Sequence, residues 1–171
     1  DIEKLNWINF HYMKELDEDA LYTLCLPHLQ KAGYAGENPD SSEASWLKSV
    51  CAAMREHVQY GAQIVDAAKV FFTEDYAPEN EETAAVLAEE TAPAVLSMFR
   101  DELKALDEVT ADTVQPLFKK IQKGLKVKGK FVYMPIRVAI TGVMHGPDLN
   151  VIVALMGREK VLNRLSAVLD K

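Results

Sequence analysis

The stretch Gly129–Leu149 reads GKFVYMPIRVAITGVMHGPDL and combines an apolar run, one interior charge and a turn. Between its terminal lysine and its terminal aspartate, Arg137 is the only charged side chain. An arginine inside an apolar run needs a partner or a surface, because burying an unpaired guanidinium is costly. Gly146 and Pro147 then favour a turn that leaves backbone groups open for hydrogen bonding.

Two interpretations fit this arrangement. An arginine beside a rigid turn suits a reader of exposed nucleotide bases, by stacking and by hydrogen bonds to base edges. Alternatively, Arg137 extends its charge to water at a helix end, and the turn only reverses the chain. Composition does not decide between them.

The same stretch resembles the C-terminal signature of bacterial glutamyl-tRNA synthetases, in which a Pro–hydrophobic–Arg segment precedes Thr-Gly and then Gly-Pro. The residues that carry the resemblance are Pro135, Ile136, Arg137, Thr141, Gly142, Gly146, Pro147 and Leu149. Three more segments resemble that family, in its order: Lys4–Asn9, Phe71–Tyr76 and Gly157–Leu165. The resemblance therefore extends over nearly the whole chain.

The resemblance implies the C-terminal anticodon-binding region of a class I aminoacyl-tRNA synthetase, a glutamate–tRNA ligase. Such a ligase attaches glutamate to tRNA at the expense of ATP, with Mg²⁺, and this region contributes tRNA affinity and anticodon selection. We expect a cytoplasmic monomer whose partner is glutamate tRNA. The candidate nucleic-acid-binding residues are His57, Met134, Pro135, Arg137, Gly146, Pro147 and Leu149.

Two of these positions depart from the family pattern. Some members carry Thr where this chain has Gly146, so only backbone contacts remain there. Members restricted to the glutamate anticodon carry Arg at the position that aligns with His57, and a neutral histidine lacks the guanidinium fork. The resemblance then implies that glutamine tRNA is accepted as well. The alternative is that His57 is an ordinary helix-end residue.

Residues 130–141 allow two secondary structures. Their β-branched and aromatic residues suit a strand, but the chain offers no convincing second strand for pairing. Pro135 at a first helical position and Gly142 as a C-terminal cap favour a helix. Because the family is helical here, we expect a helix from about residue 136.

Elsewhere, apolar spacing predicts helices throughout, and hence an all-α fold with two helical subdomains at residues 1–77 and 78–171. Pro78 and the acidic residues after it mark the boundary. Trp7 is expected in the core. The expected helices cover 4–16, 18–31, 42–58, 61–72, 83–88, 94–106, 109–123, 136–141, 149–156 and 158–169.

Charge is distributed unevenly along the 171 residues, whose net charge is −7. Residues 1–110 contain 8 Lys and Arg against 22 Asp and Glu, whereas residues 111–171 contain 11 against 4. This suggests a polyanion contact in the C-terminal third, or else a solvated lysine face. No apolar run reaches the roughly 18 residues of a membrane span. The start at Asp1 suggests a chain that begins mid-protein. The isolated Cys25 and Cys51 suggest reduced thiols that are buried or half-buried, and a structural disulfide is the less favoured alternative.

Catalytic motifs are missing from the sequence. It has no P-loop, no GxGxxG and neither of the ATP-binding signatures of a class I synthetase. Its four histidines lack metal-ligand spacing. We therefore expect no catalytic residue, metal site or cofactor in this chain, which would be inactive alone. The competing hypothesis is a free-standing all-α protein-interaction module, and a salt titration separates the two, since RNA binding weakens steeply with salt.

Overall fold

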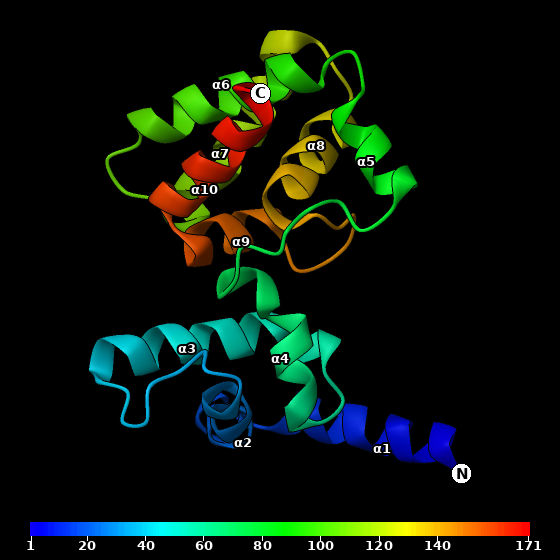
Figure 1. The fold of residues 1–171 in the computed structure, drawn as a ribbon, viewed down its shortest axis with the longest axis vertical. Coiled ribbons are helices and arrows are strands. Elements are labelled where there is room, and N and C mark those ends of the chain that lie inside the picture. The colour runs from blue at the N-terminus through cyan, green and yellow to red at the C-terminus, as the bar shows by residue number, and fades with distance from the viewer. The chain divides into compact units, whose positions relative to one another are not determined.

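The computed structural model describes residues 1–171 apart from the side chain of Asn6. In the described chain, ten α-helices and three 3-10 helices occur and there is no strand, which confirms the predicted all-α fold. The chain divides into two compact units, Asp1–Glu74 and Asp75–Lys171 (Figure 1). This division lies slightly before the one expected at residues 77 and 78.

The first unit is built around the packing of α2 on α3. The side chains of Leu21, Cys25, Leu29, Leu47 and Cys51 are fully buried there. Both cysteines are free and buried, as predicted. The elements of this unit are α1 (Ile2–Glu15), α2 (Glu18–Lys31), α3 (Ser41–Met54), η1 (Arg55–His57), η2 (Gly61–Gln63), α4 (Ile64–Ala67) and η3 (Lys69–Phe71).

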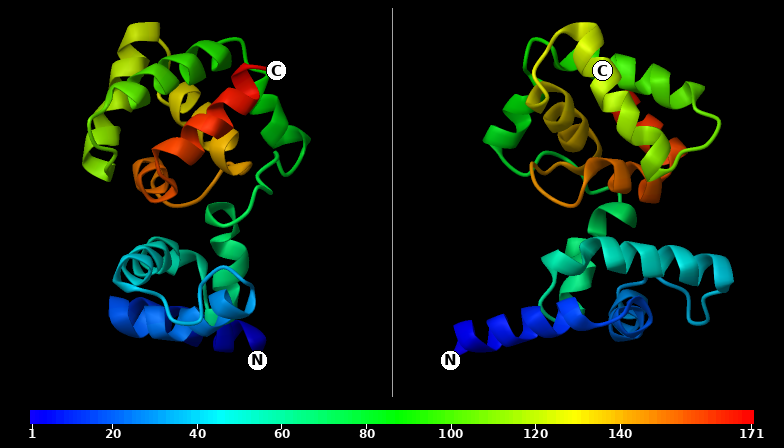
Figure 2. Two further views of the ribbon diagram at one scale, coloured as in Figure 1. Left: turned by 60° about the vertical axis from the view of Figure 1, so that its left-hand side comes forward. Right: turned by 180° about the vertical axis from the view of Figure 1, so that it is seen from behind.

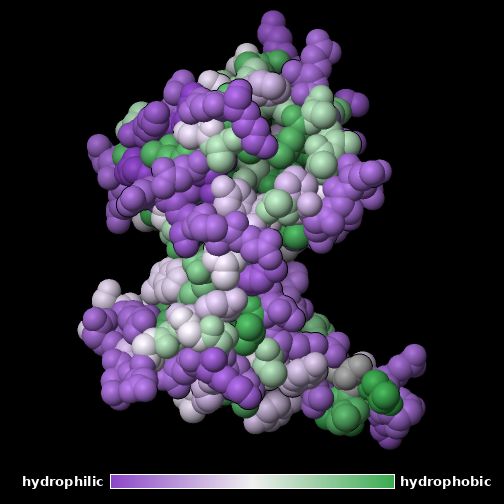
Figure 3. All heavy atoms as spheres, viewed as in Figure 1, coloured by the Kyte–Doolittle hydropathy of each residue, from purple (hydrophilic) through white to green (hydrophobic). Residues whose placement is uncertain are grey.

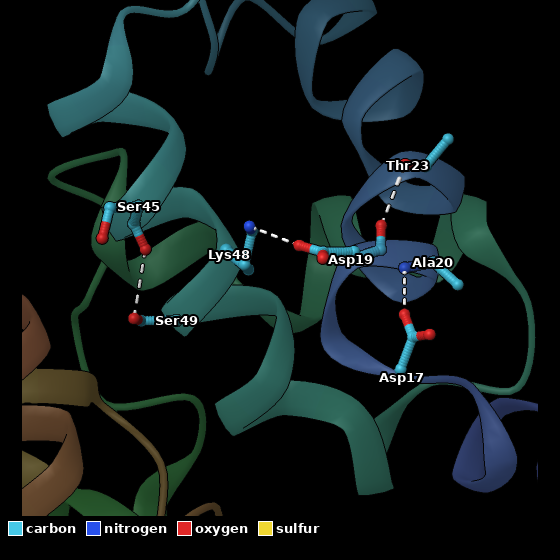
Figure 4. Close-up of polar contacts among 7 residues, drawn as sticks. All are labelled: Asp17, Asp19, Ala20, Thr23, Ser45, Lys48 and Ser49. Atoms are coloured by element: carbon cyan, nitrogen blue, oxygen red, sulfur yellow. Dashed lines mark hydrogen bonds and ion pairs between the residues drawn. The ribbon is translucent and has the colours of Figure 1, made fainter.

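Polar residues set the start of α2 and tie it to α3. Asp17 accepts a hydrogen bond from the backbone of Ala20 at 2.7 Å and so caps the N-terminus of α2. Lys48 on α3 forms an ion pair with Asp19 on α2 (Figure 4). Asp40 caps the start of α3 in the same way and accepts from the backbone of Glu43 at 2.8 Å.

Two helix predictions in this unit are wrong. The helix expected to run to residue 58 ends at Met54. Arg55 begins a 3-10 helix instead, and its guanidinium donates to the carbonyls of Met13 and Lys14 at 3.1 and 3.2 Å. The helix expected over 61–72 is three short pieces. Tertiary contacts override helix propensity there, since Phe72 stacks on the Tyr34 ring at 4.7 Å.

The expectation for Trp7 is also wrong, because its side chain is 63% exposed. Leu5, Ile8 and Tyr12 on the same helix are exposed as well, whereas Met13 is buried. Apolar side chains, in green, are visible at the surface near the N-terminal end of the chain (Figure 3). The apolar spacing therefore predicted the helix correctly but not what covers it. Arg55 and Met13 join α1 to its unit at its C-terminal end.

The second unit surrounds α8, which contacts α5, α6, α7 and α10 (Figure 2). The rings of Phe99 and Phe118 stack 5.7 Å apart beside it. The predicted helix starts at residues 149 and 158 are confirmed. The helices are α5 (Glu81–Leu87), α6 (Ala92–Ala105), α7 (Ala111–Leu125), α8 (Lys130–Thr141), α9 (Leu149–Met156) and α10 (Arg158–Leu169).

Helix α8 begins at Lys130 rather than near residue 136, so Pro135 lies inside it and not at its first position. The carbonyl of Gly129 accepts from the backbone of Val132 and Tyr133 at 2.9 and 3.0 Å, which starts the helix earlier. Pro135 itself is buried, and packing offsets the backbone hydrogen bond that a proline cannot donate. Gly142 ends the helix at φ 77°, as the predicted C-terminal cap.

Candidate nucleic-acid interface

Arg137 lies near the middle of α8, between buried Ile136 and Val138. Its Nη1 atom is buried and has no hydrogen-bond partner among the described residues. Burial lowers the pKa of Arg137, while the nearby charge of Asp148 acts to raise it. The Nη1 end of the guanidinium is therefore not in water, although the Arg137 side chain as a whole is half-buried. An unsatisfied donor of this kind costs about 1–3 kcal/mol until something accepts from it.

The predicted turn lies directly against this nitrogen. Gly146 has φ 154°, and a Cβ placed on it would lie 3.2 Å from Arg137 Nη1. A side chain at position 146 would therefore crowd the guanidinium. The residue would also have to keep a backbone conformation that L residues rarely adopt. Gly146 is exposed and Pro147 is half-buried. The structure thus brings Arg137 and the turn together, although they are nine positions apart in sequence.

The other candidates of this stretch have supporting positions. Leu149 is 2% exposed and Pro135 is buried, so their side chains belong to the core below the turn. Met134 is half-buried. Asp148 is the residue before α9, but its side chain makes no capping hydrogen bond. Its carboxylate instead contributes to the charge environment of Arg137.

Hydrogen bonds of the Thr141 hydroxyl and of the Gly142 backbone hold the C-terminal end of α8, from which the chain continues into the turn. The Thr141 hydroxyl donates to the Arg137 carbonyl at 2.6 Å, and the Val143 amide donates to that hydroxyl at 3.2 Å. The Glu79 amide donates to the Gly142 carbonyl at 3.0 Å. A Cβ at Gly142 would lie 2.3 Å from the Tyr76 carbonyl oxygen, so glycine is the residue that fits.

Arg164 is the supporting residue that sequence reasoning missed. It is 1% exposed, donates from Nη1 to the Ile140 carbonyl at 2.8 Å, and places its guanidinium 4.2 Å from the centre of the Tyr76 ring. Arg164 therefore connects α10, the end of α8 and the segment before α5. Its position beside Leu165 and three residues after Val161, on the apolar stripe of its helix, was the available signal.

His57 lies in the first unit, whereas Arg137 lies in the second. It is the last residue of η1, and its side chain is exposed. This placement suits a ligand contact and suits a helix-end residue equally. Nearby Arg55 is half-buried, and its Nη1 donates to carbonyls at the end of α1, so it serves the fold.

Neither a candidate metal site nor a membrane-spanning helix occurs among the described residues. The described residues contain no group of three or more His, Cys, Asp or Glu that could hold a metal ion. Among those same residues, none of the helices combines the length and apolar character needed to cross a membrane.

The fold and the arginine–turn arrangement can be set beside known proteins. Residues 20–169 match the family model described as an anticodon binding domain, and the chain belongs to that family. It is 45% identical over 166 residues to the glutamate–tRNA ligase of Listeria monocytogenes serotype 4b (strain F2365), with 96% of this chain and 34% of that protein covered. It is 42% identical over 168 residues to the glutamate–tRNA ligase of Bacillus subtilis (strain 168), with 98% and 35% covered.

Solved structures agree on the fold. A crystal structure of a glutamate tRNA ligase from Elizabethkingia meningosepticum, in complex with its amino acid, matches all of this chain and 32% of its own, with a TM-score of 0.84 and 19% identity. A glutamate–tRNA synthetase from Elizabethkingia anophelis gives a TM-score of 0.76. The chain spans about a third of the length of the curated relatives that it matches. The predicted similarity to glutamate–tRNA ligases is thereby confirmed.

Proposed function

We propose that this chain is the anticodon-recognising part of a glutamate–tRNA ligase, and that its partner is tRNA. The observation that carries the proposal is the buried, unpaired Nη1 of Arg137 against the exposed turn at Gly146. The family and the named relatives support it and do not favour a free-standing protein-interaction module. The ligase as a whole would attach glutamate to tRNA using ATP and Mg²⁺, as a cytoplasmic monomer.

Recognition would combine contacts from the backbone of the turn with a contact from the Arg137 side chain. Anticodon bases are unstacked, so one can lie on the exposed turn and present its edge to the free backbone groups at Gly146 and Pro147. Arg137 would donate from its guanidinium to a base carbonyl or ring nitrogen. Because Nη1 is buried against Gly146, a bond from that nitrogen would need the turn to shift, and it would then satisfy a donor that otherwise has no partner. Leu149 and Pro135 would support the turn from the core.

His57 would contribute to selection between tRNAs. Glutamate and glutamine anticodons differ at their third base. A neutral histidine provides one donor and cannot bond a base edge in the bidentate way of arginine. We therefore propose that the ligase accepts both tRNAs, with weak discrimination at that base.

The test measures binding of the chain to anticodon stem-loops with the glutamate anticodon and with single-base changes. Arg137→Ala should weaken binding of the glutamate loop by about 1–3 kcal/mol and reduce the preference among loops. Arg137→Lys keeps the charge but not the fork, so it should lose the preference while retaining part of the affinity.

The matched control is Lys104→Ala, which removes one exposed positive charge of the same unit. It should leave the preference among loops unchanged. A wild-type chain with no preference among the loops contradicts the proposal. If Arg137→Ala unfolds the second unit in circular dichroism, Arg137 is a structural residue instead.

A further inference from the structure

Lysines are concentrated around the bend between α7 and α8, and they take no part in the proposed base-reading site. Between residues 113 and 147 the chain contains six lysines and one arginine, and no aspartate or glutamate. The lysines are Lys119, Lys120, Lys123, Lys126, Lys128 and Lys130, which we call the lysine bend. The first three of these lysines lie on α7, the next two follow it, and the last is the first residue of α8, while the turn at Gly146 follows the other end of α8.

Few of these lysines serve the fold. Lys120 forms an ion pair with Glu102 at 2.9 Å, and the Lys130 ammonium lies 5.4 Å from the Phe131 ring centre. Within the described chain, no ion pair involves Lys123, Lys126 or Lys128, and all three are exposed. Their charges are therefore available to a partner.

Two of the lysines occupy positions that local structure disfavours. Lys126 caps α7 at φ 55° and is the one non-glycine residue with a positive φ in the described part of the chain. Glycine is the usual residue there, because a Cβ is strained in the left-handed region. Lys130 is the first residue of α8, where the helix dipole repels a cation. Departures from local preference are expected at functional or strained sites.

We propose that the lysine bend is a second tRNA contact, which binds the phosphate backbone and does not read bases. The inference rests on the proposed function and adds a surface to it. Exposed ammonium groups without partners suit phosphates, since each contact releases condensed counterions and needs no fixed geometry. Specificity and affinity then come from different contacts. Arg137 and the turn select the anticodon, and the lysine bend supplies affinity that depends on salt.

The test compares two double variants of the full chain that change the net charge equally. Lys126→Gly with Lys130→Gln removes the two disfavoured lysines. Lys31→Gln with Lys104→Gln removes two exposed lysines outside the bend. Affinity is measured for glutamate tRNA and for a tRNA with an unrelated anticodon, from 0.05 to 0.3 M salt, and melting temperatures are recorded for each protein.

The bend variant should bind both tRNAs at least about fivefold more weakly at 0.1 M salt, and its log–log salt slope should be shallower by roughly 1.5. Its melting temperature should stay level or rise by a few degrees, because glycine relieves the strain at position 126. The control variant should keep nearly all of its affinity. A loss of affinity combined with a higher melting temperature cannot come from a structural role.

Each other result overturns the inference. Equal weakening in the control variant shows a general charge effect, and loss for one tRNA alone shows base reading. A lower melting temperature together with weaker binding shows that the lysines serve the fold. Unchanged binding of the bend variant overturns the inference and leaves the proposed function standing. A wild-type chain that binds no tRNA at low salt overturns both.

Discussion

Gly142→Ala is expected to destabilise the second unit strongly, for two reasons that can be separated. The new Cβ would lie 2.3 Å from the Tyr76 carbonyl oxygen and 2.4 Å from that of Ala77, and both are backbone atoms. The residue would also keep φ near 77°, where an L side chain costs about 1–2 kcal/mol. Moving the segment away would add about 1–3 kcal/mol of strain. The expected loss is therefore roughly 2–5 kcal/mol, a large share of the stability of a small domain.

The control for this variant is Gly157→Ala. Gly157 has φ 91°, but a Cβ there meets nothing within 4 Å. At ψ 155° Gly157 occupies a region that glycine almost alone adopts, so this variant should lose about 1–3 kcal/mol without any clash. Gly142 is in the less costly left-handed region, so the extra loss in Gly142→Ala is a lower bound on the cost of the close approach of Tyr76 and Ala77.

Urea unfolding with two probes shows which unit is affected. Both tryptophans, Trp7 and Trp46, lie in the first unit, so their fluorescence reports on that unit. Circular dichroism reports on both. Gly142→Ala should shift the dichroism transition to lower urea while the tryptophan transition keeps its midpoint. If Gly142→Ala and Gly157→Ala shift it equally, or if the tryptophan transition moves instead, the steric reasoning is refuted.

Three further predictions concern support, selectivity and catalysis. Arg164→Lys keeps the charge but loses the flat contact with Tyr76, so it should lower the stability of the second unit by about 1–3 kcal/mol in the same urea assay; an unchanged midpoint would count against it. In an intact ligase containing this chain, His57→Arg should raise charging of glutamate tRNA relative to glutamine tRNA, and a parent that already rejects glutamine tRNA by more than about a hundredfold, roughly 2.7 kcal/mol, would rule this out. The chain alone should catalyse no glutamate-dependent pyrophosphate exchange, because its sequence has no motif that cradles ATP phosphates; measurable exchange would contradict the assignment.

The candidate site at Arg137 and Gly146 could be located from sequence because its signals are local. A lone charge in an apolar run and a Gly-Pro turn after it are visible at Arg137 and Gly146 without coordinates. Their contact is not visible, since it depends on how the chain returns after Gly142. The early start of α8 was missed because Pro135 is compatible with a first turn, and sequence alone does not show that packing permits it deeper in the helix.

Burial was harder to predict than helix formation. The spacing of apolar residues gives the face of a helix, but it does not show whether anything covers that face, and Trp7 is exposed for this reason. For Arg164 the expectation is wrong in the opposite sense, because a charged residue is buried. A charged side chain is expected at the surface, whereas Arg164 is buried with the aromatic ring of Tyr76 and the carbonyl of Ile140 among its partners.

The anchoring of Tyr76 and Glu79 has a consequence for dividing the protein. By sequence, Pro78 looks like a loose joint where the chain can be cut. In the structure, the residues just before and after it are built into the second unit, through the ring under Arg164 and the amide bonded to Gly142. A version of this unit expressed from Pro78 onward would leave a buried guanidinium without its ring and should aggregate or melt early. One that begins at Asp75 keeps both contacts, so it is the shorter piece that can be expected to fold independently and to survive a protease.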